Sequence, residues 1–173
     1  MNQGYENKQD KAVTVKFKVV GNSSKYILAW TTTPWTLPAN LGLAVGEGIG
    51  YSEILDKASG DTYVLATDRI ATYYKSSDDY TLVRSYPGSC LVGLKYEPLY
   101  FDWNEMSELP RGMNLGSNVY SVVVGHHVTT DSGTGVVHIA PAFGEDDNII
   151  GIEKDLGYVG HINMTGNVEH ISF

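Results

Sequence analysis

The sequence predicts a mainly β fold, either a β-barrel or a β-sandwich, with helices at its periphery. Three observations favour this class: many short segments have the alternating pattern of strands, 19 glycines supply turns, and few segments have helical periodicity. No regular alternation of strands and helices supports a doubly wound sheet. With 173 residues, of which 42% are hydrophobic, the chain is long enough for one domain with a buried core.

The strands are predicted from runs in which apolar and polar residues alternate. Between residues 13 and 20, Val13, Val15 and Phe17 alternate with polar residues, which is typical of a half-buried strand. A turn at 21–24 and a second strand at 25–30 complete a hairpin. Further strands are predicted at 41–45, 51–55, 62–66, 80–84, 118–124 and 135–139.

Two helices are predicted, one between and one after these strands. The first is short, covers 67–75, and has Thr67 or Asp68 as its N-cap. The second covers 145–156 and ends at a glycine. The spacing of Ile149, Ile152 and Leu156 predicts one apolar face on this second helix.

The charge of the chain argues against autonomous binding of nucleic acid. The formal net charge is -8; residues 1–95 hold ten Lys or Arg and nine Asp or Glu, whereas residues 96–173 hold two and eleven. Proteins that bind phosphates through counterion release usually carry a clustered basic face. Only the lysines near the start approach such a cluster, and alternation along a strand explains Lys16 and Lys18 equally well.

Composition also predicts a location. The longest apolar runs fall far short of the roughly 18 residues that a membrane-spanning helix needs, and no basic segment followed by an apolar one marks secretion. The single cysteine, Cys90, cannot form an internal disulfide. We therefore expect a reducing compartment, the cytoplasm, and a buried position for this side chain.

Three motifs are explained better by structure than by chemistry. The glycines at 46–50 have the wrong spacing for a dinucleotide fingerprint and predict turns. Ser132 lacks the flanking glycines of a nucleophile elbow and predicts a tight turn. His126 and His127 are adjacent and would point to opposite faces of a strand, so we predict neither a metal site nor a cofactor.

The segment 30–40, Trp-Thr-Thr-Thr-Pro-Trp-Thr-Leu-Pro-Ala-Asn, resists a purely structural explanation. Four threonines within six positions place hydroxyl groups on an extended backbone, and Pro34 and Pro38 force the residues before them toward β or polyproline geometry. A threonine-rich edge strand is the alternative. The paired prolines favour a rigid loop, because each removes a ladder donor.

The segment 133–147, Gly-Thr-Gly-Val-Val-His-Ile-Ala-Pro-Ala-Phe-Gly-Glu-Asp-Asp, is the second that carries chemistry. A strand that includes His138 leads to a turn at Pro141, and a helix then begins with three consecutive acids. Acids in a first helical turn stabilise the helix dipole by about 0.3–1 kcal/mol each. Because one acid would suffice and three repel one another, a carboxylate remains available for an external cation.

Together the two segments resemble the editing domain of class I aminoacyl-tRNA synthetases, the connective-peptide insertion of the isoleucyl, valyl and leucyl enzymes. Thr33-Pro34 resembles the isoleucyl version, because the valyl and leucyl versions have Arg-Pro there. The resemblance covers residues 12–165 and implies a small closed β-barrel with flanking helices. ATP-handling signatures of the HIGH and KMSKS types do not occur in the sequence, so we expect the adenylate-forming site elsewhere in a larger synthetase.

The resemblance implies the following site. Asp147 holds the α-ammonium group of the substrate, and His138 lines the side-chain pocket, where its bulk excludes isoleucine. A threonine group lies around the ester and the terminal ribose: Thr31, Thr32 and Thr33. The remaining substrate contacts are Asn40, Trp35, Gly133, Thr134 and Gly135.

The implied reaction is hydrolysis of tRNA for isoleucine that is wrongly esterified with valine. One methylene in an apolar pocket discriminates by only about 1–3 kcal/mol, so a second site that removes the error is needed. No residue stands out as a covalent nucleophile, which favours direct attack by a positioned water. The expected partners are the 3′ end of the mischarged tRNA and the remainder of the synthetase in cis; no membrane partner is expected, and the isolated domain is expected to be a monomer.

Two other functions stay open at this stage. A freestanding trans-editing deacylase would share the site but should carry its own basic docking surface. A non-catalytic tRNA-docking module would not require Asp147 together with His138. For the editing domain itself, the expected organisation is a linker or terminal extension at 1–11, the domain at 12–165, and a linker at 166–173 that returns toward the synthetase core.

Overall fold

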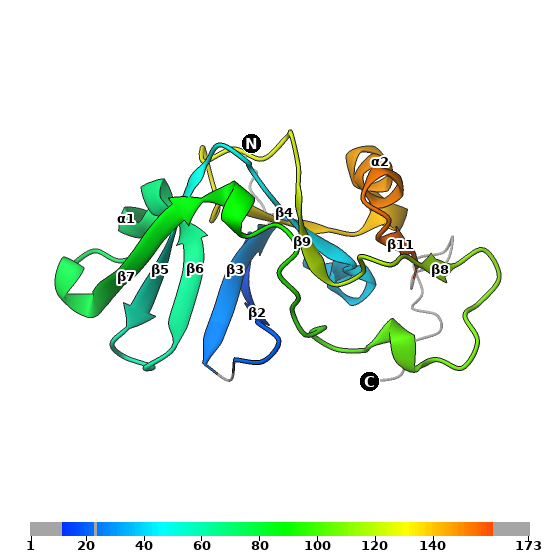
Figure 1. Ribbon diagram of the computed structural model, residues 1–173, viewed down its shortest axis with the longest axis horizontal. Helices are drawn as coiled ribbons and strands as arrows, with labels where there is room; N and C mark the ends of the chain where they lie inside the picture. The colour runs from blue at the N-terminus through cyan, green and yellow to red at the C-terminus, as the bar shows by residue number, and fades with distance from the viewer. Residues whose placement is uncertain (1–11, 23, 161–173) are drawn as a thin grey trace, which may run out of the picture.

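A computed structural model describes residues 12–22 and 24–160 (Figure 1). The strands are β2 (Val13–Lys18), β3 (Lys25–Thr31), β4 (Gly42–Val45), β5 (Gly50–Asp56), β6 (Thr62–Ala66), β7 (Tyr80–Pro87), β8 (Asn114–Leu115), β9 (Ser121–Val124), β10 (Val136–Ile139) and β11 (Gly157–Tyr158). The α-helices are α1 (Ile70–Tyr73) and α2 (Glu145–Glu153), and the 3-10 helices are η1 (Pro34–Ala39), η2 (Thr67–Arg69), η3 (Ser77–Asp79), η4 (Gly88–Cys90), η5 (Trp103–Glu105) and η6 (Pro141–Phe143). The mainly β class with peripheral helices is confirmed, and the predicted terminal linkers at 1–11 and 166–173 lie outside the described residues.

Strand β3 is the branch point of the sheet. The hydrogen-bonded order is β7-β5-β6-β3-β10-β4-β9, and β2 pairs with β3 outside this path. One edge of β3 pairs antiparallel with β2. The other edge pairs first with β6, as far as Ile27, and then with β10 at Trp30. The sheet therefore divides near Leu28 into a β6-β5-β7 branch and a β10-β4-β9 branch, which Figure 1 shows on the two sides of β3.

A segment without regular strand structure bridges the β10-β4-β9 branch back to β2. Lys95 forms a bridge with Ser121 of β9, and Tyr96 forms a bridge with Val19, just after β2. Glu97 donates its N–H to the carbonyl of the last β2 residue at 2.8 Å. The barrel is thus closed only through these isolated bridges, while the named strands form a curled, open path.

The main core fills the space inside this curled sheet. Phe17 of β2 contacts Tyr96 edge-to-face at a centroid distance of 5.1 Å, and Tyr96 contacts Tyr120 in the same manner at 6.1 Å. A second, smaller core lies on the other face of the β6-β5 branch, where Ile70 of α1 packs on the sheet. The largest fully buried side chains of the main core are Phe17, Ile27, Leu41, Leu43, Tyr51, Tyr96, Trp103, Ile139 and Leu156.

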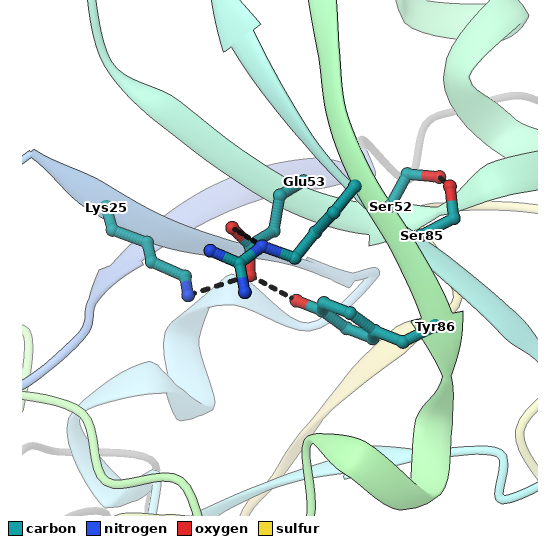
Figure 2. Close-up of polar contacts among 6 residues, drawn as sticks. Lys25, Ser52, Glu53, Ser85 and Tyr86 are labelled. Atoms are coloured by element: carbon teal, nitrogen blue, oxygen red, sulfur yellow. Dashed lines mark hydrogen bonds and ion pairs between the residues drawn. The ribbon is translucent and has the colours of Figure 1, made fainter.

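A buried carboxylate ties three strands of the first branch together. Glu53 of β5 accepts hydrogen bonds from Lys25 of β3 at 2.8 Å and from the Tyr86 hydroxyl of β7 at 2.7 Å, as Figure 2 shows. Arg84 lies 3.4 Å from the other carboxylate oxygen. Burial alone would raise the pKa of Glu53, but the hydrogen bonds and positive charges of these partners lower it.

The expected strands are present, with one misplaced start. The segment predicted at 118–124 forms a strand only from Ser121, because Tyr120 has a positive φ of 60° and ends a turn. Strand β7 continues past the predicted end at residue 84 to Pro87. The threonine-rich segment does not continue as an edge strand: β3 ends at Thr31, and the following residues form the 3-10 helix η1.

Both helix predictions need correction. Residues 67–69 form a 3-10 turn with no side-chain cap, since the Thr67 hydroxyl lies 2.7 Å from that of Ser52 instead. Helix α2 ends at Glu153, and the predicted apolar face is wrong: Ile149 and Ile152 are 49% and 75% exposed. The helix packs on η6 through its buried Ile150 and Gly151. No described helix has the length and apolar character to span a bilayer.

Cys90 is exposed, so the prediction of a buried cysteine is wrong. In the same turn, η4, the residue that faces the protein interior is Gly88. A Cβ added to Gly88 would lie 2.1 Å from the carbonyl oxygen of Gly46. Only a glycine fits this approach. Cys90, two residues later in η4, consequently faces solvent.

Candidate functional site

A pocket with a volume of about 340 Å³ lies where β3 ends beside β10 and the start of α2. Most of its lining side chains are polar, and they come from two parts of the chain that are about a hundred residues apart. The lining residues are Trp30, Thr31, Thr32, Thr33, Thr36, His127, Thr129, Ser132, Thr134, Gly135, Val136, Val137, His138, Phe143, Asp146 and Asp147.

The threonine wall is held in shape by its own hydroxyl groups. Thr31 ends β3, and its Oγ1 accepts the N–H of Thr33 at 3.0 Å, which turns the chain sharply. Pro34 follows at the first position of η1, where a missing N–H costs nothing. The Thr36 hydroxyl donates to the Thr33 carbonyl at 2.8 Å. Thr32 is exposed, and its hydroxyl makes no hydrogen bond with the described residues.

The opposite wall sits in the fork where β6 and β10 separate along β3. The Thr134 hydroxyl donates to the Leu28 carbonyl at 2.7 Å, and the Thr134 carbonyl accepts the N–H of Ala66 at 2.7 Å. Gly133 has a φ of +69° and lies against Trp30 so closely that an added Cβ would be 2.6 Å from the indole. This loop is therefore fixed by the hydrogen bonds of Thr134 to two strands and by packing on the Trp30 ring, which leaves little room for a side chain at Gly133.

Asp147 places a carboxylate in the pocket from the first turn of α2. Its Oδ2 accepts the N–H of Ala140 at 3.1 Å, and its other oxygen accepts no hydrogen bond from the described residues. Burial raises the pKa of Asp147, an effect that the Ala140 hydrogen bond and the nearby His127 partly oppose and that Asp146 reinforces. A cationic group that entered the pocket would find one oxygen of a partly desolvated carboxylate available.

His138 lines the pocket from β10 and is 6% exposed. Its Nε2 lies 2.8 Å from the Thr36 hydroxyl, and its Nδ1 lies 2.8 Å from the side-chain nitrogen of Asn40. The single proton of the Thr36 hydroxyl is donated to Thr33, so the imidazole donates to Thr36 and does not accept from it. Thr36 is consequently not a nucleophile activated by His138.

The described residues contain no group of three or more His, Cys, Asp or Glu side chains arranged to hold a metal ion. The pocket instead combines one carboxylate, a set of hydroxyl groups and an imidazole that forms part of the wall. Such a site can bind an amine through the carboxylate and a polar ester through the hydroxyls, and it can position a water molecule.

Sequence comparison gives relatives over most of the chain. A protein of Bdellovibrio bacteriovorus named "Isoleucine--tRNA ligase" is 43% identical over 147 residues, which are 84% of this chain and 13% of that protein. The Treponema denticola protein of the same name is 40% identical over 178 residues, 89% of this chain and 16% of the relative. "Isoleucine--tRNA ligase, cytoplasmic" of Saccharomyces cerevisiae is 43% identical over 148 residues, 84% of this chain and 13% of the relative.

The chain belongs to the isoleucine-tRNA ligase family. It spans 13–16% of the length of these relatives. No protein-family model matches it.

Solved structures show which known fold the chain shares. The structure described as GlLeuRS-CP1 superposes with a TM-score of 0.60 at 16% identity, over 83% of this chain and 61% of the other. The editing domain of the P. knowlesi cytosolic leucyl-tRNA synthetase superposes with a TM-score of 0.57 at 15% identity, over 83% and 62% of the two chains. The chain therefore has the fold of a synthetase editing domain.

The site residues expected from the sequence fall into two groups. Seven line the pocket: Thr31, Thr32, Thr33, Thr134, Gly135, His138 and Asp147. Three others do not line it. Asn40 is buried behind His138, Gly133 packs against Trp30, and Trp35 is 58% exposed on η1.

The sequence did not point to several other side chains that the fold brings to the pocket. Thr36 and Phe143 lie within the two motifs, but the motifs alone do not show which of their residues line the pocket. His127, Thr129 and Ser132 come from the loop before β10, where the sequence predicts a tight turn at Ser132 and no ligand role for His127. The charge contact of His127 with Asp147 needs the folded loop, because the two residues are 20 positions apart.

Proposed function

We propose that the pocket hydrolyses the ester bond of tRNA for isoleucine that has been mischarged with valine. The observation that carries this proposal is the position of Asp147: a partly buried carboxylate with one available oxygen faces the same pocket as the threonine hydroxyls. The α-ammonium of an esterified amino acid is the cation that such a carboxylate would bind, and a charged hydrogen bond of this kind contributes about 1.5–3 kcal/mol.

The other walls fit the remaining parts of the substrate. Thr31, Thr32 and Thr33 surround the ester and the terminal ribose, and His138 limits the length of the amino-acid side chain. A water molecule, positioned by the bound substrate and the hydroxyls, attacks the ester carbonyl directly. The volume of about 340 Å³ is at the small end of the range of ligand pockets, which suits one amino acid and its ribose better than a longer oligonucleotide.

The rest of the substrate is held outside this segment. Residues 96–173 carry two basic and eleven acidic residues, so the half of the chain that holds α2 repels a phosphate backbone. In the proposed function the segment acts in cis with the remainder of a cytoplasmic synthetase, which holds the tRNA body and delivers the charged 3′ end. By itself the chain is expected to bind uncharged tRNA weakly.

The test is a deacylation assay with valyl-tRNA and isoleucyl-tRNA, both made on tRNA for isoleucine. The wild type is expected to hydrolyse the valyl ester faster. Asp147→Ala should reduce this rate at least about 100-fold, because the ammonium loses its orienting contact. Glu145→Ala is the matched control. Glu145 is an exposed acid in the same helical turn, but it does not line the pocket.

The outcomes separate the functions considered. Equal loss in Glu145→Ala and Asp147→Ala would contradict the assignment of Asp147. Absence of hydrolysis in the wild type, together with binding of the tRNA end, would support a docking module instead. Fast hydrolysis with tight binding of the whole tRNA by this segment alone would support a freestanding deacylase.

A further inference from the structure

A chain of hydrogen bonds leads from the barrel interior to the pocket wall. Tyr96 lies in the segment that bridges β9 and β2, is 2% exposed, and donates its hydroxyl proton to Oδ1 of Asn40. Asn40 donates in turn to Nδ1 of His138 at 2.8 Å and to the Gly42 carbonyl at 2.9 Å. Tyr96 itself is absent from the pocket lining, so its hydroxyl can act on the pocket only through Asn40.

The direction of each bond in this chain is determined by its neighbours. The Gly42 carbonyl can only accept, so the Asn40 atom that faces it and His138 is the amide nitrogen. The Asn40 oxygen must therefore face Tyr96, whose hydroxyl donates because burial raises its pKa and keeps it protonated. At the other end, the hydroxyl contacted by Nε2 already donates its own proton to a carbonyl. His138 is thus the Nε2–H tautomer.

We propose that Tyr96 is a positioning residue that sets the amino-acid specificity of the pocket by holding His138, through Asn40, in one tautomer and orientation. The proposal rests on the proposed function, in which His138 rejects isoleucine. A side chain that excludes a substrate by one methylene group must keep a fixed orientation. The His138 ring has little freedom to rotate, because one of its nitrogens donates a hydrogen bond and the other accepts one.

The ring and the hydroxyl of Tyr96 have separable roles. The ring packs edge-to-face on Phe17 and Tyr120, and a phenylalanine would keep both contacts. The hydroxyl is the donor to Asn40 Oδ1, an atom of a residue that is only 5% exposed. Without that donor, the buried Asn40 oxygen has no partner, and the side chain shifts to regain one, which weakens the bond from its nitrogen to Nδ1 of His138.

The first measurement is the tautomer of His138, read from the ring nitrogen shifts in 1H–15N NMR spectra of the whole chain, with His138→Ala used for assignment. The wild type is expected to show a protonated Nε2 and an acceptor Nδ1. Tyr96→Phe should mix the two tautomers. Tyr120→Phe is the matched control, because it removes another buried hydroxyl, which accepts the N–H of Trp103, and should leave the His138 shifts unchanged.

The second measurement is the ratio of isoleucyl to valyl ester hydrolysis. Tyr96→Phe is expected to raise this ratio about two- to tenfold, the effect of one buried hydrogen bond. In a His138→Ala background the same substitution should leave the ratio unchanged, because the residue through which it acts is gone. A merely structural role would instead lower both rates together in both backgrounds.

Each outcome is decisive. A wild type with Nδ1 protonated, or a Tyr96→Phe spectrum identical to the wild type, overturns the hydrogen-bond chain. A changed tautomer with an unchanged hydrolysis ratio overturns the specificity role. If the wild type hydrolyses neither ester, the proposed function fails, while the NMR result still tests the positioning of His138 on its own.

Discussion

Asp147 is held in a state that disfavours its own charge. Burial raises its folded pKa above the ordinary value, so the folded protein binds a proton more readily than the unfolded chain does. The stabilisation that Asp147 gives the folded state is therefore complete at a pH below its pKa in the unfolded chain. It is lost as the pH rises through its pKa in the folded protein. A ligand that brings a positive charge would recover this loss, which is the behaviour expected of a binding group.

This argument predicts the effect of Asp147→Asn. The amide keeps an oxygen for the Ala140 N–H but removes the desolvated charge, so the free energy of unfolding at pH 7 should stay equal or rise by up to about 1 kcal/mol. Ester hydrolysis should fall at least about 100-fold. Thermal melts between pH 4 and 8, compared with the wild type, check the first expectation and deacylation rates check the second. A clear loss of stability at pH 7 would mean that the carboxylate is structural.

His138→Ala tests the steric wall directly. Removing the imidazole should open space for the longer side chain, so hydrolysis of isoleucyl-tRNA should rise while hydrolysis of valyl-tRNA falls less than in Asp147→Ala. The hydrogen bonds to Thr36 and Asn40 are lost as well, at a cost of about 1–3 kcal/mol in unfolding free energy. The measurement is the ratio of the two rates per folded molecule. Loss of both rates in equal proportion would indicate a packing role only.

At this scale the sequence predicts residue types better than contacts. The motifs correctly placed Thr31, His138 and Asp147 in one site. The chemistry of these residues follows from their type, and their positions follow from the pattern of the family. The place of Asn40 behind the wall is set by Tyr96, which lies 56 residues away. No local pattern in the sequence encodes such a partner.

The turn between β3 and η1 divides the threonines into structural and substrate-facing positions. Thr31 is 7% exposed and accepts the N–H that forms the turn, whereas the Thr32 hydroxyl makes no bond with the described residues. Thr31→Ala should lower the free energy of unfolding by about 1–2 kcal/mol and the hydrolysis rate with it. Thr32→Ala should change stability by less than about 0.5 kcal/mol and lower only the rate. Chemical denaturation alongside deacylation separates them, and equal melting behaviour of the two variants would contradict the division.

The Glu53 network predicts how the β6-β5-β7 branch responds to acid. Because Lys25, Tyr86 and Arg84 lower the folded pKa of Glu53, its contribution is present above the unfolded pKa and is lost as the pH falls through the folded pKa. Glu53→Gln should cost about 1–3 kcal/mol at pH 7 and flatten the acid limb of the stability curve. Glu47→Gln, at an exposed acid, is the control. Urea unfolding from pH 3 to 7 gives the comparison, and parallel curves for wild type and Glu53→Gln would rule out this role.

Regular strands were predictable because the alternation of apolar and polar residues shows which face of a strand is buried. The hairpin of β2 and β3 lies within a residue or two of its expected bounds. Helix α2 was harder. Its Ile149 and Ile152 have the spacing of a buried face, yet the close approach of Gly151 to Pro141 turns that face outward. Contact with a particular neighbour decided the orientation, and hydrophobic periodicity carries no information about that neighbour.

The whole molecule depends on the bridges at residues 95–97 to close its sheet. Glu97 is exposed, but its N–H bonds the last residue of β2, so Glu97→Pro removes one closing bond while Glu97→Ala keeps it. The proline variant should lose about 1–3 kcal/mol of unfolding free energy relative to the alanine variant. Hydrogen exchange of the amides of β2 and β9 should rise in the proline variant. Matching stability of the two variants would show that closure contributes nothing.

The fork in β3 also fixes an order of events in time. The hairpin of β2 and β3 closes a loop of a few residues, but the bond between Thr134 and Leu28 joins positions 106 residues apart. Contacts of such long range form slowly, since the chain entropy must be lost before they stabilise anything. When synthesis has reached residue 124, every strand up to β9 has been made, but the residues of the second wall have not. Ligand-binding competence should therefore appear after most of the strand signal in refolding, as the last part of this chain to mature.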